Sequence, residues 1–292
     1  MQGSPRRASE KLAAVWAEIQ RLGLESHIAE LDAVGYTVIP PEKVAPPSFT
    51  KRMIEAFRKV TKKRLGVDLD LDIKTAMPWL EKIPWQPLNY MLFEDRVFQE
   101  AACNPVALAF ADYAVGRSCM LSTCIGLVKG PDASELQLHT DHWAMLIPSP
   151  YPPYAMYVNT HWLLTDYTKE GGALCFVPGS HKYGRAPEAG EGLDERVAVE
   201  APAGSLVVWG GSTWHGSFAR QVPGLRLSLV SSYTRPFVIP QEPYKQNVTP
   251  EIIAANPPRF HELMGKNLYQ GFKEEGFDEE KVALGIGSTW WD

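Results

Sequence analysis

The sequence predicts a mainly β fold with flanking helices, built on a double-stranded β-helix core of the jelly-roll, cupin-like type. Two observations support this prediction. Over residues 118–236, short runs rich in β-branched and aromatic residues alternate with glycine and proline turns, a pattern typical of two packed sheets. Residues 1–117 instead repeat their apolar residues at helical spacing, so we expect a largely helical region that packs on the barrel.

The N-terminal region is expected to hold helices and one short strand. Its helical spacing breaks near Gly23, and a short strand at 35–40 ends at a Pro-Pro pair. The stretch 66–95 contains Pro and Trp without a clear period, so we expect it to be irregular. We expect helices over 8–34, 48–63 and 98–115.

The strands of the core are expected where apolar runs lie between turn residues. We place them at 119–128, 135–146, 155–165, 173–177, 196–200, 205–210, 214–218 and 225–235. Residues 237–292 follow as a C-terminal extension, partly helical near 260–270, that is a candidate lid. No boundary separates the helical region from the barrel, so we expect a single domain over 1–292.

Composition narrows the classes of partner and compartment. The net charge of −5 argues against nucleic acid as a partner, because phosphate binders are usually basic. The chain has no run of about 18 apolar residues and no apolar secretory segment, so we expect no membrane partner and a cytoplasmic protein. The sequence leaves the oligomeric state open. The cysteines form no CxxC pair, so we expect buried reduced thiols at Cys103, Cys119, Cys124 and Cys175.

Two short motifs supply a candidate metal site. His139-Thr-Asp141 and the distal His215 together offer two imidazoles and one carboxylate, the set that holds Fe(II) on one face and leaves other positions open. Residues i and i+2 of a strand share a face, so we expect His139 and Asp141 to point the same way. The same alternation directs Gln137 with them and His142 away from them, as a surface or supporting group.

A guanidinium follows eleven residues after the distal histidine. Arg226 lies in an apolar strand-like run, and a buried guanidinium needs a partner, of which a bidentate carboxylate is the best. Ser228, two residues further, faces the same side. Iron ligands combined with a downstream arginine indicate an oxygenase that uses iron and 2-oxoglutarate.

These motifs resemble the phytanoyl-CoA dioxygenase family of 2-oxoglutarate oxygenases, over about residues 28–236. The resemblance rests on the segments Leu31–Pro40, Gln137–His142, Leu164–Lys182, Ala203–Trp209 and His215–Ser217, and on Arg226. It includes the run Pro-Gly-Ser-His-Lys at 178–182. This chain has Gly171-Gly172 where the family often has Asn-Gly, which we expect to alter only the turn.

The resemblance implies a role for each matching residue. The iron ligands would be His139, Asp141 and His215, and Arg226 would anchor the distal carboxylate of 2-oxoglutarate. Positions that contact the cosubstrate in some relatives are occupied by Gln137, by Ser217 and by His161 or its neighbour Trp162, and Ser228 can add a hydroxyl. Fe(II), 2-oxoglutarate and O2 are the implied cofactors of one oxygenase domain. The carboxylate of Asp141, which related halogenases lack, favours hydroxylation, desaturation or ring-forming oxidation.

The substrate is less well defined by the sequence. Trp143, Tyr157 and Trp209 flank the motifs and are candidates for substrate contact, although large aromatic residues are also common in cores. We expect a small, apolar organic substrate. Two alternatives stay open: a cupin-like hydrolase or isomerase with zinc or manganese, in which Arg226 has no evident role, and a catalytically silent relative that binds a small molecule.

Overall fold

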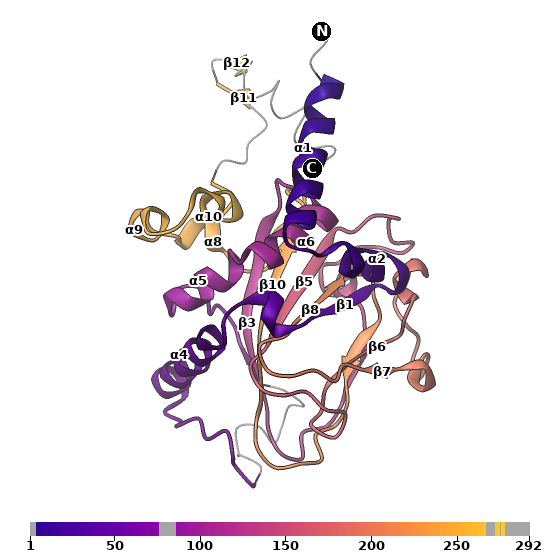
Figure 1. Cartoon of the computed structure of the whole chain (residues 1–292), viewed down its shortest axis with the longest axis vertical. Helices are drawn as coiled ribbons and strands as arrows, with labels where there is room; N and C mark the ends of the chain where they lie inside the picture. Colours follow the sequence, from indigo (N-terminus) through magenta and orange to yellow (C-terminus); the bar gives the residue numbers. More distant parts are fainter. Residues whose placement is uncertain (1–3, 76–85, 267–271, 275, 278–292) are drawn as a thin grey trace.

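Two antiparallel sheets share a core in the part of the chain that the computed structural model describes, residues 4–75, 86–266, 272–274 and 276–277 (Figure 1). One sheet has six strands in the order β1-β8-β5-β10-β3-β2, and the other has four in the order β4-β9-β6-β7. The strands are β1 Tyr36–Ile39, β2 Gln86–Leu88, β3 Met120–Lys129, β4 Leu136–His139, β5 Tyr157–Leu163, β6 Leu174–Phe176, β7 Val197–Ala198, β8 Leu206–Gly210, β9 His215–Ser217 and β10 Arg226–Thr234. A separate hairpin pairs β11 Phe272–Lys273 with β12 Gly276–Phe277.

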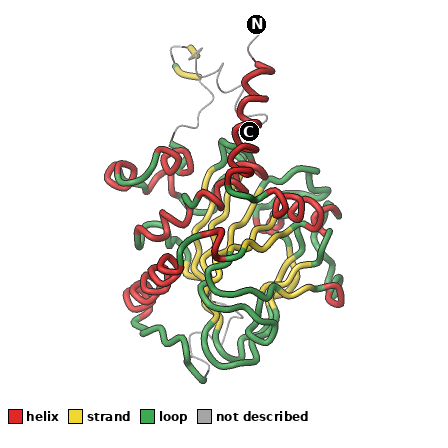
Figure 2. The backbone as a smooth tube through the Cα atoms, in the orientation of Figure 1, coloured by secondary structure: helices red, strands yellow, loops and turns green. Residues whose placement is uncertain are grey.

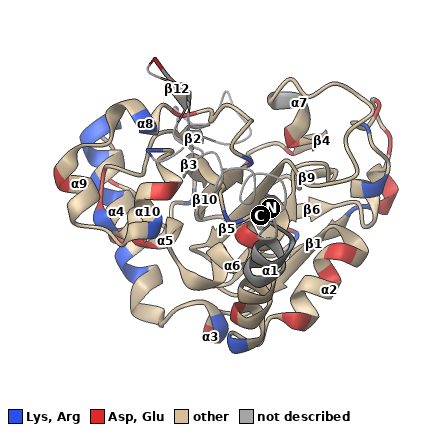
Figure 3. Ribbon diagram, turned by 90° about the horizontal axis from the view of Figure 1, so that it is seen from above, with Lys and Arg blue, Asp and Glu red and all other residues tan. Residues whose placement is uncertain are grey.

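Most helices lie before β3 and after β10 in the chain, and they flank the sheets (Figure 2). They are α1 Ser4–Arg21, α2 Glu25–Val34, α3 Pro41–Val44, α4 Pro47–Leu65, α5 Arg96–Ala102, α6 Pro105–Val115, α7 Asp141–Ala144, α8 Tyr244–Asn247, α9 Pro250–Ala254 and α10 Pro258–Leu263. Two short 3-10 turns lie at Ser180–Lys182 and Leu193–Glu195. Seen from above, α4, α5 and α8 to α10 gather on one side, and α2 lies on the other (Figure 3).

Two apolar clusters hold the layers together. The larger cluster joins α4, α5 and α6 to the six-stranded sheet and includes Phe57, Phe98 and Phe110, all 0% exposed. The smaller cluster draws on strands of both sheets and includes Phe176 and Trp209. A helical layer therefore covers the large sheet, while aromatic and aliphatic side chains fill the space between the sheets, as in a jelly roll.

Several expected elements differ from the structure in their bounds. The single helix expected over 98–115 is two helices, because the Asn104 side chain accepts hydrogen bonds from Val106 N and Ala107 N and starts a new helix at Pro105. The region expected to be irregular contains β2, which pairs with the edge of β3. Its Pro87 cannot donate to a ladder, but an edge strand tolerates proline.

The strand expected over 135–146 is much shorter, and this corrects one argument. β4 ends at His139, and Asp141 opens the short helix α7. Alternation along a strand is therefore the wrong reason for placing the two side chains on one face. The turn after β4 brings the carboxylate toward the imidazole instead.

The C-terminal part packs beside the large sheet. Tyr244 of α8 stacks on Tyr90, with ring centroids 5.4 Å apart, and the buried carboxylate of Glu242 accepts hydrogen bonds from Cys124 N and Tyr90 N. Residues 278–292, including the Trp290-Trp291 pair, lie outside the described residues, so the expected lid is untested. The four cysteines carry free thiols. No described helix has both the length and the apolar character needed to cross a membrane.

Candidate metal and cosubstrate site

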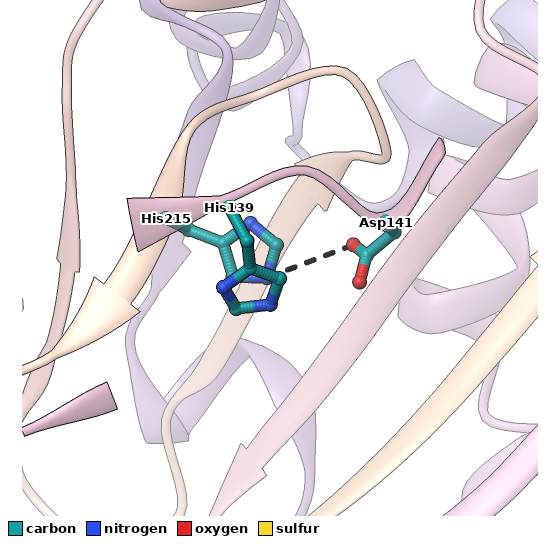
Figure 4. Close-up of side chains that lie close together, drawn as sticks. All are labelled: His139, Asp141 and His215. Atoms are coloured by element: carbon teal, nitrogen blue, oxygen red, sulfur yellow. Dashed lines mark ion pairs between the residues drawn. The ribbon is translucent and has the colours of Figure 1, made fainter. Parts of the chain in front are cut away.

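The metal motifs meet at one end of the sheets. His139 ends β4, and His215, opposite it in the antiparallel pair, begins β9, so the β4–β9 ladder sets their imidazoles side by side with ring centroids 4.2 Å apart. Asp141 follows from α7, with its Oδ2 3.7 Å from Nε2 of His215 (Figure 4). One ligand atom from each of the three residues lies within 4.8 Å of the others.

Backbone carbonyls orient both imidazoles. Nδ1 of His139 lies 2.9 Å from the carbonyl oxygen of Gln137, and Nδ1 of His215 lies 2.9 Å from that of Thr213. A carbonyl oxygen only accepts, so each Nδ1 carries the proton and each Nε2 presents its lone pair. Burial lowers the pKa of His215 to about 4, which keeps this imidazole neutral near pH 7. A metal ligand needs that neutral form.

Donors on the neighbouring strands hold the carboxylate. Oδ2 of Asp141 accepts from Nδ2 of Asn159 at 2.7 Å and from Nε1 of Trp209 at 3.2 Å. Asn159 is in turn held by Ser232, whose hydroxyl donates to its Oδ1 at 2.6 Å. Oδ2 of Asp141 accepts both of these hydrogen bonds, and Oδ1 accepts neither. Such supporting bonds usually orient a metal-binding carboxylate.

The donor set fits a divalent metal of the iron type. Two imidazoles and one carboxylate bring their ligand atoms within 4.8 Å of one another, and this donor set is that of a facial triad with open positions. The triad is also partly accessible, because His139 and Asp141 are half-buried while His215 is buried.

Arg226 is the first residue of β10, and its surroundings form a second part of the site, the arginine end. Arg226 and Ser228 are buried, and Nη1 of Arg226 donates to the carbonyl of Gly172. The guanidinium lies over the ring of Tyr167, 5.0 Å from its centroid. Within the described part of the chain, Nε of Arg226 and the hydroxyl of Ser228 have no hydrogen-bond partner. Buried polar atoms of this kind usually find a partner, so these two are available to bind a polar ligand.

His161 lies between the arginine and the triad. Its Nε2 is 2.9 Å from the hydroxyl of Tyr167, and its ring centroid is 5.7 Å from that of Trp209. Burial, with the charge of Arg226 as the next cause, holds the pKa of His161 well below its usual value. His161 is therefore a neutral group close to Arg226 and His215. The resemblance left open whether His161 or Trp162 occupies the position that contacts the cosubstrate in some relatives.

A lysine that the sequence analysis did not select shares this end of the site. Lys129 ends β3, is 0% exposed, and donates from Nζ to Ser217 Oγ at 3.0 Å and to the carbonyl of Phe218 at 2.5 Å. Burial and then the charge of Arg226 lower its pKa to about 7. Lys129 is the only charged residue of β3, and that contrast is the signal by which the sequence could have revealed it.

The other candidate residues lie at different distances from this chemistry. The side chain of Gln137 is exposed, and the residue serves the triad through its carbonyl. Tyr157 is buried, with its hydroxyl 3.2 Å from Oε1 of Gln241. The side chain of Trp143 lies outside the described residues. His142, expected at the surface or in support, is fully buried beside Tyr151.

Two cavities are lined by residues other than the triad and Arg226. One of about 710 Å³ lies between α2, α6 and the Pro-rich loop 151–155, and none of the triad residues lines it. It adjoins the site through two of its lining residues: Tyr151, whose hydroxyl bonds to that of Thr140, and Thr213, whose carbonyl oxygen lies 2.9 Å from Nδ1 of His215. A groove of about 410 Å³ runs along residues 236–246, beside Met120 and Leu121 at the start of β3. We place the chemistry at the triad, because cavity size alone does not identify a reacting centre.

Comparisons with known proteins agree with this fold. The curated dioxygenase af480 of Aspergillus fumigatus is 29% identical over 193 residues, which cover 65% of this chain and 62% of that protein. The match thus spans less than two thirds of the relative's length. HygX from Streptomyces hygroscopicus, solved with nickel and 2-oxoglutarate bound, superposes with a TM-score of 0.59 at 20% identity, over 74% of this chain and 88% of that one.

A second solved structure is the non-heme alpha ketoglutarate dependent carbocyclase SnoK from nogalamycin biosynthesis. It superposes with a TM-score of 0.54 at 20% identity, over 72% of this chain and 83% of that one. At such identities the likeness shows the fold, and it confirms the expected mainly β architecture with a jelly-roll core. The model of the Phytanoyl-CoA dioxygenase family matches residues 31–227, more than half of the chain. This chain belongs to the phytanoyl-CoA dioxygenase family.

Proposed function

We propose that this protein is a non-haem dioxygenase, dependent on Fe(II) and 2-oxoglutarate, that hydroxylates a small and mainly apolar organic molecule. The observation that carries the proposal is the convergence of His139, Asp141 and His215 within 4.8 Å, with both Nε2 atoms presented. When bound, Fe(II) with O2 and 2-oxoglutarate supplies an oxidant, and the cosubstrate is converted to succinate and CO2.

The chain's own residues position these groups. The two histidines and Asp141 hold the metal, and Asn159 with Trp209 keeps one carboxylate oxygen turned toward the strands. Arg226 and the free hydroxyl of Ser228 receive the distal carboxylate of 2-oxoglutarate at the far end of the site. Neutral His161 lies between these ends and adds no charge that would compete with the metal.

The type of oxidation that we propose depends on the presence of the Asp141 carboxylate. Asp141 supplies the third protein ligand and so fills the position that a missing carboxylate would free for a halide, and we propose hydroxylation. SnoK shares the fold and is described as a carbocyclase, so a ring-forming oxidation is the principal alternative outcome.

Apolar side chains at the metal end support an apolar substrate. The loop between α7 and β5 exposes Leu146 and Tyr154, and the segment after β10 exposes Phe237 and Ile239. The first segment follows Asp141 directly in the chain, and the two segments meet where the start of β5 at Tyr157 lies opposite the end of β10 at Thr234. Exposed apolar residues gathered at one end commonly mark a binding surface.

The test is an anaerobic titration of Fe(II) and then 2-oxoglutarate, observed by the weak visible charge-transfer band of the chelate. The wild-type protein should show the band, and His215→Ala should lose it. The control His27→Gln, which removes a histidine of α2, should keep it. Metal binding without a band in the wild type would favour the hydrolase or isomerase alternative, and no metal binding would favour a silent binding protein.

A further inference from the structure

A second buried cation lies opposite the arginine of the cosubstrate end. Lys129, the last residue of β3, is paired in register with Arg226, the first residue of β10. Directly opposed residues of an antiparallel pair place their Cβ atoms about 4.5–5.5 Å apart on one face of the sheet. The two cationic side chains therefore leave the sheet from adjacent points and enter the same interior.

Protein groups satisfy these cations only in part. Among the residues that the structure describes, neither Lys129 nor Arg226 takes part in an ion pair. Lys129 uses two of its three N–H donors, on Ser217 and Phe218, and Arg226 leaves Nε without a partner. Buried like charges without a counter-ion are costly, so this end of the site is prepared for an anion.

The other groups that face Lys129 do not supply that anion. Arg220 is a further cation whose donors go to the carbonyls of Gly171, Pro223 and Gly224. Glu135 lies nearby but is bonded to Arg196 at 2.9 Å. Burial raises the pKa of the Cys175 thiol to about 11, so it stays neutral.

We propose that Lys129 acts together with Arg226 as a second cationic anchor for the distal carboxylate of 2-oxoglutarate, and that the pair selects 2-oxo acids with a second carboxylate. This inference rests on the proposed function. A carboxylate has about four acceptor positions. It can accept from Arg226, from the third N–H of Lys129 and from the hydroxyl of Ser228, while Lys129 also fixes the orientation of Ser217.

The protonation of Lys129 should change in a measurable way when 2-oxoglutarate binds. In the empty site the pKa of Lys129 is lowered to about 7, chiefly by burial and next by Arg226. A carboxylate that arrives beside the ammonium favours its charged form and raises this pKa. At pH 7.5 the protein should therefore take up a fraction of a proton when 2-oxoglutarate binds.

A comparison of two ligands measures the contribution of the distal carboxylate to binding. 2-Oxoglutarate and 2-oxopentanoate have the same metal-chelating end, but 2-oxopentanoate carries a methyl group in place of the distal carboxylate. We would titrate both into the anaerobic protein loaded with redox-inert Mn(II), by isothermal calorimetry in buffers of different ionisation enthalpy. The variants are Lys129→Gln and Lys129→Met, with Lys182→Gln as the control that removes a lysine near the surface.

The wild type should prefer 2-oxoglutarate, and both Lys129 variants should lose about tenfold or more of that preference, since one charge-assisted bond is lost. The affinity for 2-oxopentanoate should change by less than about threefold, because its contacts do not include the distal anchor. Proton uptake should occur in the wild type and in Lys182→Gln with 2-oxoglutarate only, and it should vanish in Lys129→Gln.

The outcomes separate this inference from the proposed function. A wild-type protein that binds neither ligand overturns the proposed function itself. Folded Lys129 variants that keep both the preference and the proton uptake overturn the inference and leave the oxygenase assignment intact. Should the variants fail to fold, the wild type decides alone, because 2-oxoglutarate binding without proton uptake contradicts the role of Lys129.

Discussion

His139 and His215 are direct partners across the β4–β9 ladder, with their ring centroids 4.2 Å apart. Strand pairing, rather than a flexible loop, therefore sets the separation of the two imidazoles. The residue between His215 and Ser217 makes this close approach possible. A Cβ added at Gly216 would overlap the carbonyl oxygen of Leu136 in β4 and would lie 3.1 Å from that of Gln137.

Gly216→Ala should consequently weaken both the fold and the metal site. Backbone atoms cannot move aside as a flexible side chain can, so β9 must shift away from β4, at a cost of about 1–3 kcal/mol in the free energy of unfolding. Urea denaturation and Mn(II) affinity measure the two effects. Gly210→Ala is the control, because a Cβ there meets nothing within 4 Å. Unchanged metal affinity in a folded Gly216→Ala protein would show that the ladder does not set the imidazole spacing.

Asn159→Ala should lower the affinity for metal by about 10–100-fold, the usual effect of removing a group that orients a metal ligand. The variant removes the 2.7 Å bond to Oδ2 of Asp141 and frees the carboxylate to rotate. Thr160→Val, the adjacent residue of β5, removes a buried hydrogen bond to Ser231 that does not involve the triad, and it should retain metal affinity. Equal losses in the two variants would argue for general damage to β5.

Arg226→Gln should raise the 2-oxoglutarate concentration needed for half-maximal turnover by about tenfold or more, with a smaller effect on metal affinity. The guanidinium is the group we assign to the distal carboxylate, and Gln cannot supply its charge. Arg220→Gln is the matched comparison, since the donors of Arg220 go to backbone carbonyls. It should reduce thermal stability more than cosubstrate affinity. A cosubstrate requirement untouched by Arg226→Gln would falsify the assignment.

Acid should destabilise the metal-free protein through its buried histidines. Burial lowers the pKa of His142 to about 4 and that of His161 well below the usual value, whereas both return to about 6.5 on unfolding. The unfolded chain then binds more protons below pH 6.5. Stability is fully present above this pH and is lost as the pH falls toward 4, at up to about 1.4 kcal/mol per pH unit for each histidine.

Urea denaturation at pH 7.5 and pH 5.0 measures this dependence. His161→Phe should reduce the difference in stability between the two pH values, because a phenyl ring has no proton to bind. His27→Gln serves as the comparison: its pKa is also lowered by burial, but it is only partly buried. An unchanged pH dependence in His161→Phe would mean that this imidazole already carries a proton in the folded protein.

Much of the architecture follows from local sequence patterns. Apolar runs between turn residues indicated most strands of both sheets, and helical spacing indicated α1, α2 and α4. The misplaced boundaries have local physical causes. Asn104 ends one helix by capping the next, and Asp141 begins α7 where alternation suggested a continuing strand. The strand β2 was not predicted because it contains Pro87, and proline is unfavourable in any strand except at an edge.

By itself, the sequence determined which residue types are available to a metal, and the spacing of His139, Asp141, His215 and Arg226 identified their candidate roles. Tertiary structure alone decided that Asn159 holds Asp141 and that Lys129 faces Arg226. The first contact joins β5 to α7 and the second joins β3 to β10, and the existence of both depends on sheet order and register. Neither is encoded in the local pattern of either strand, because a register shift of one residue would turn the same side chains to the opposite face.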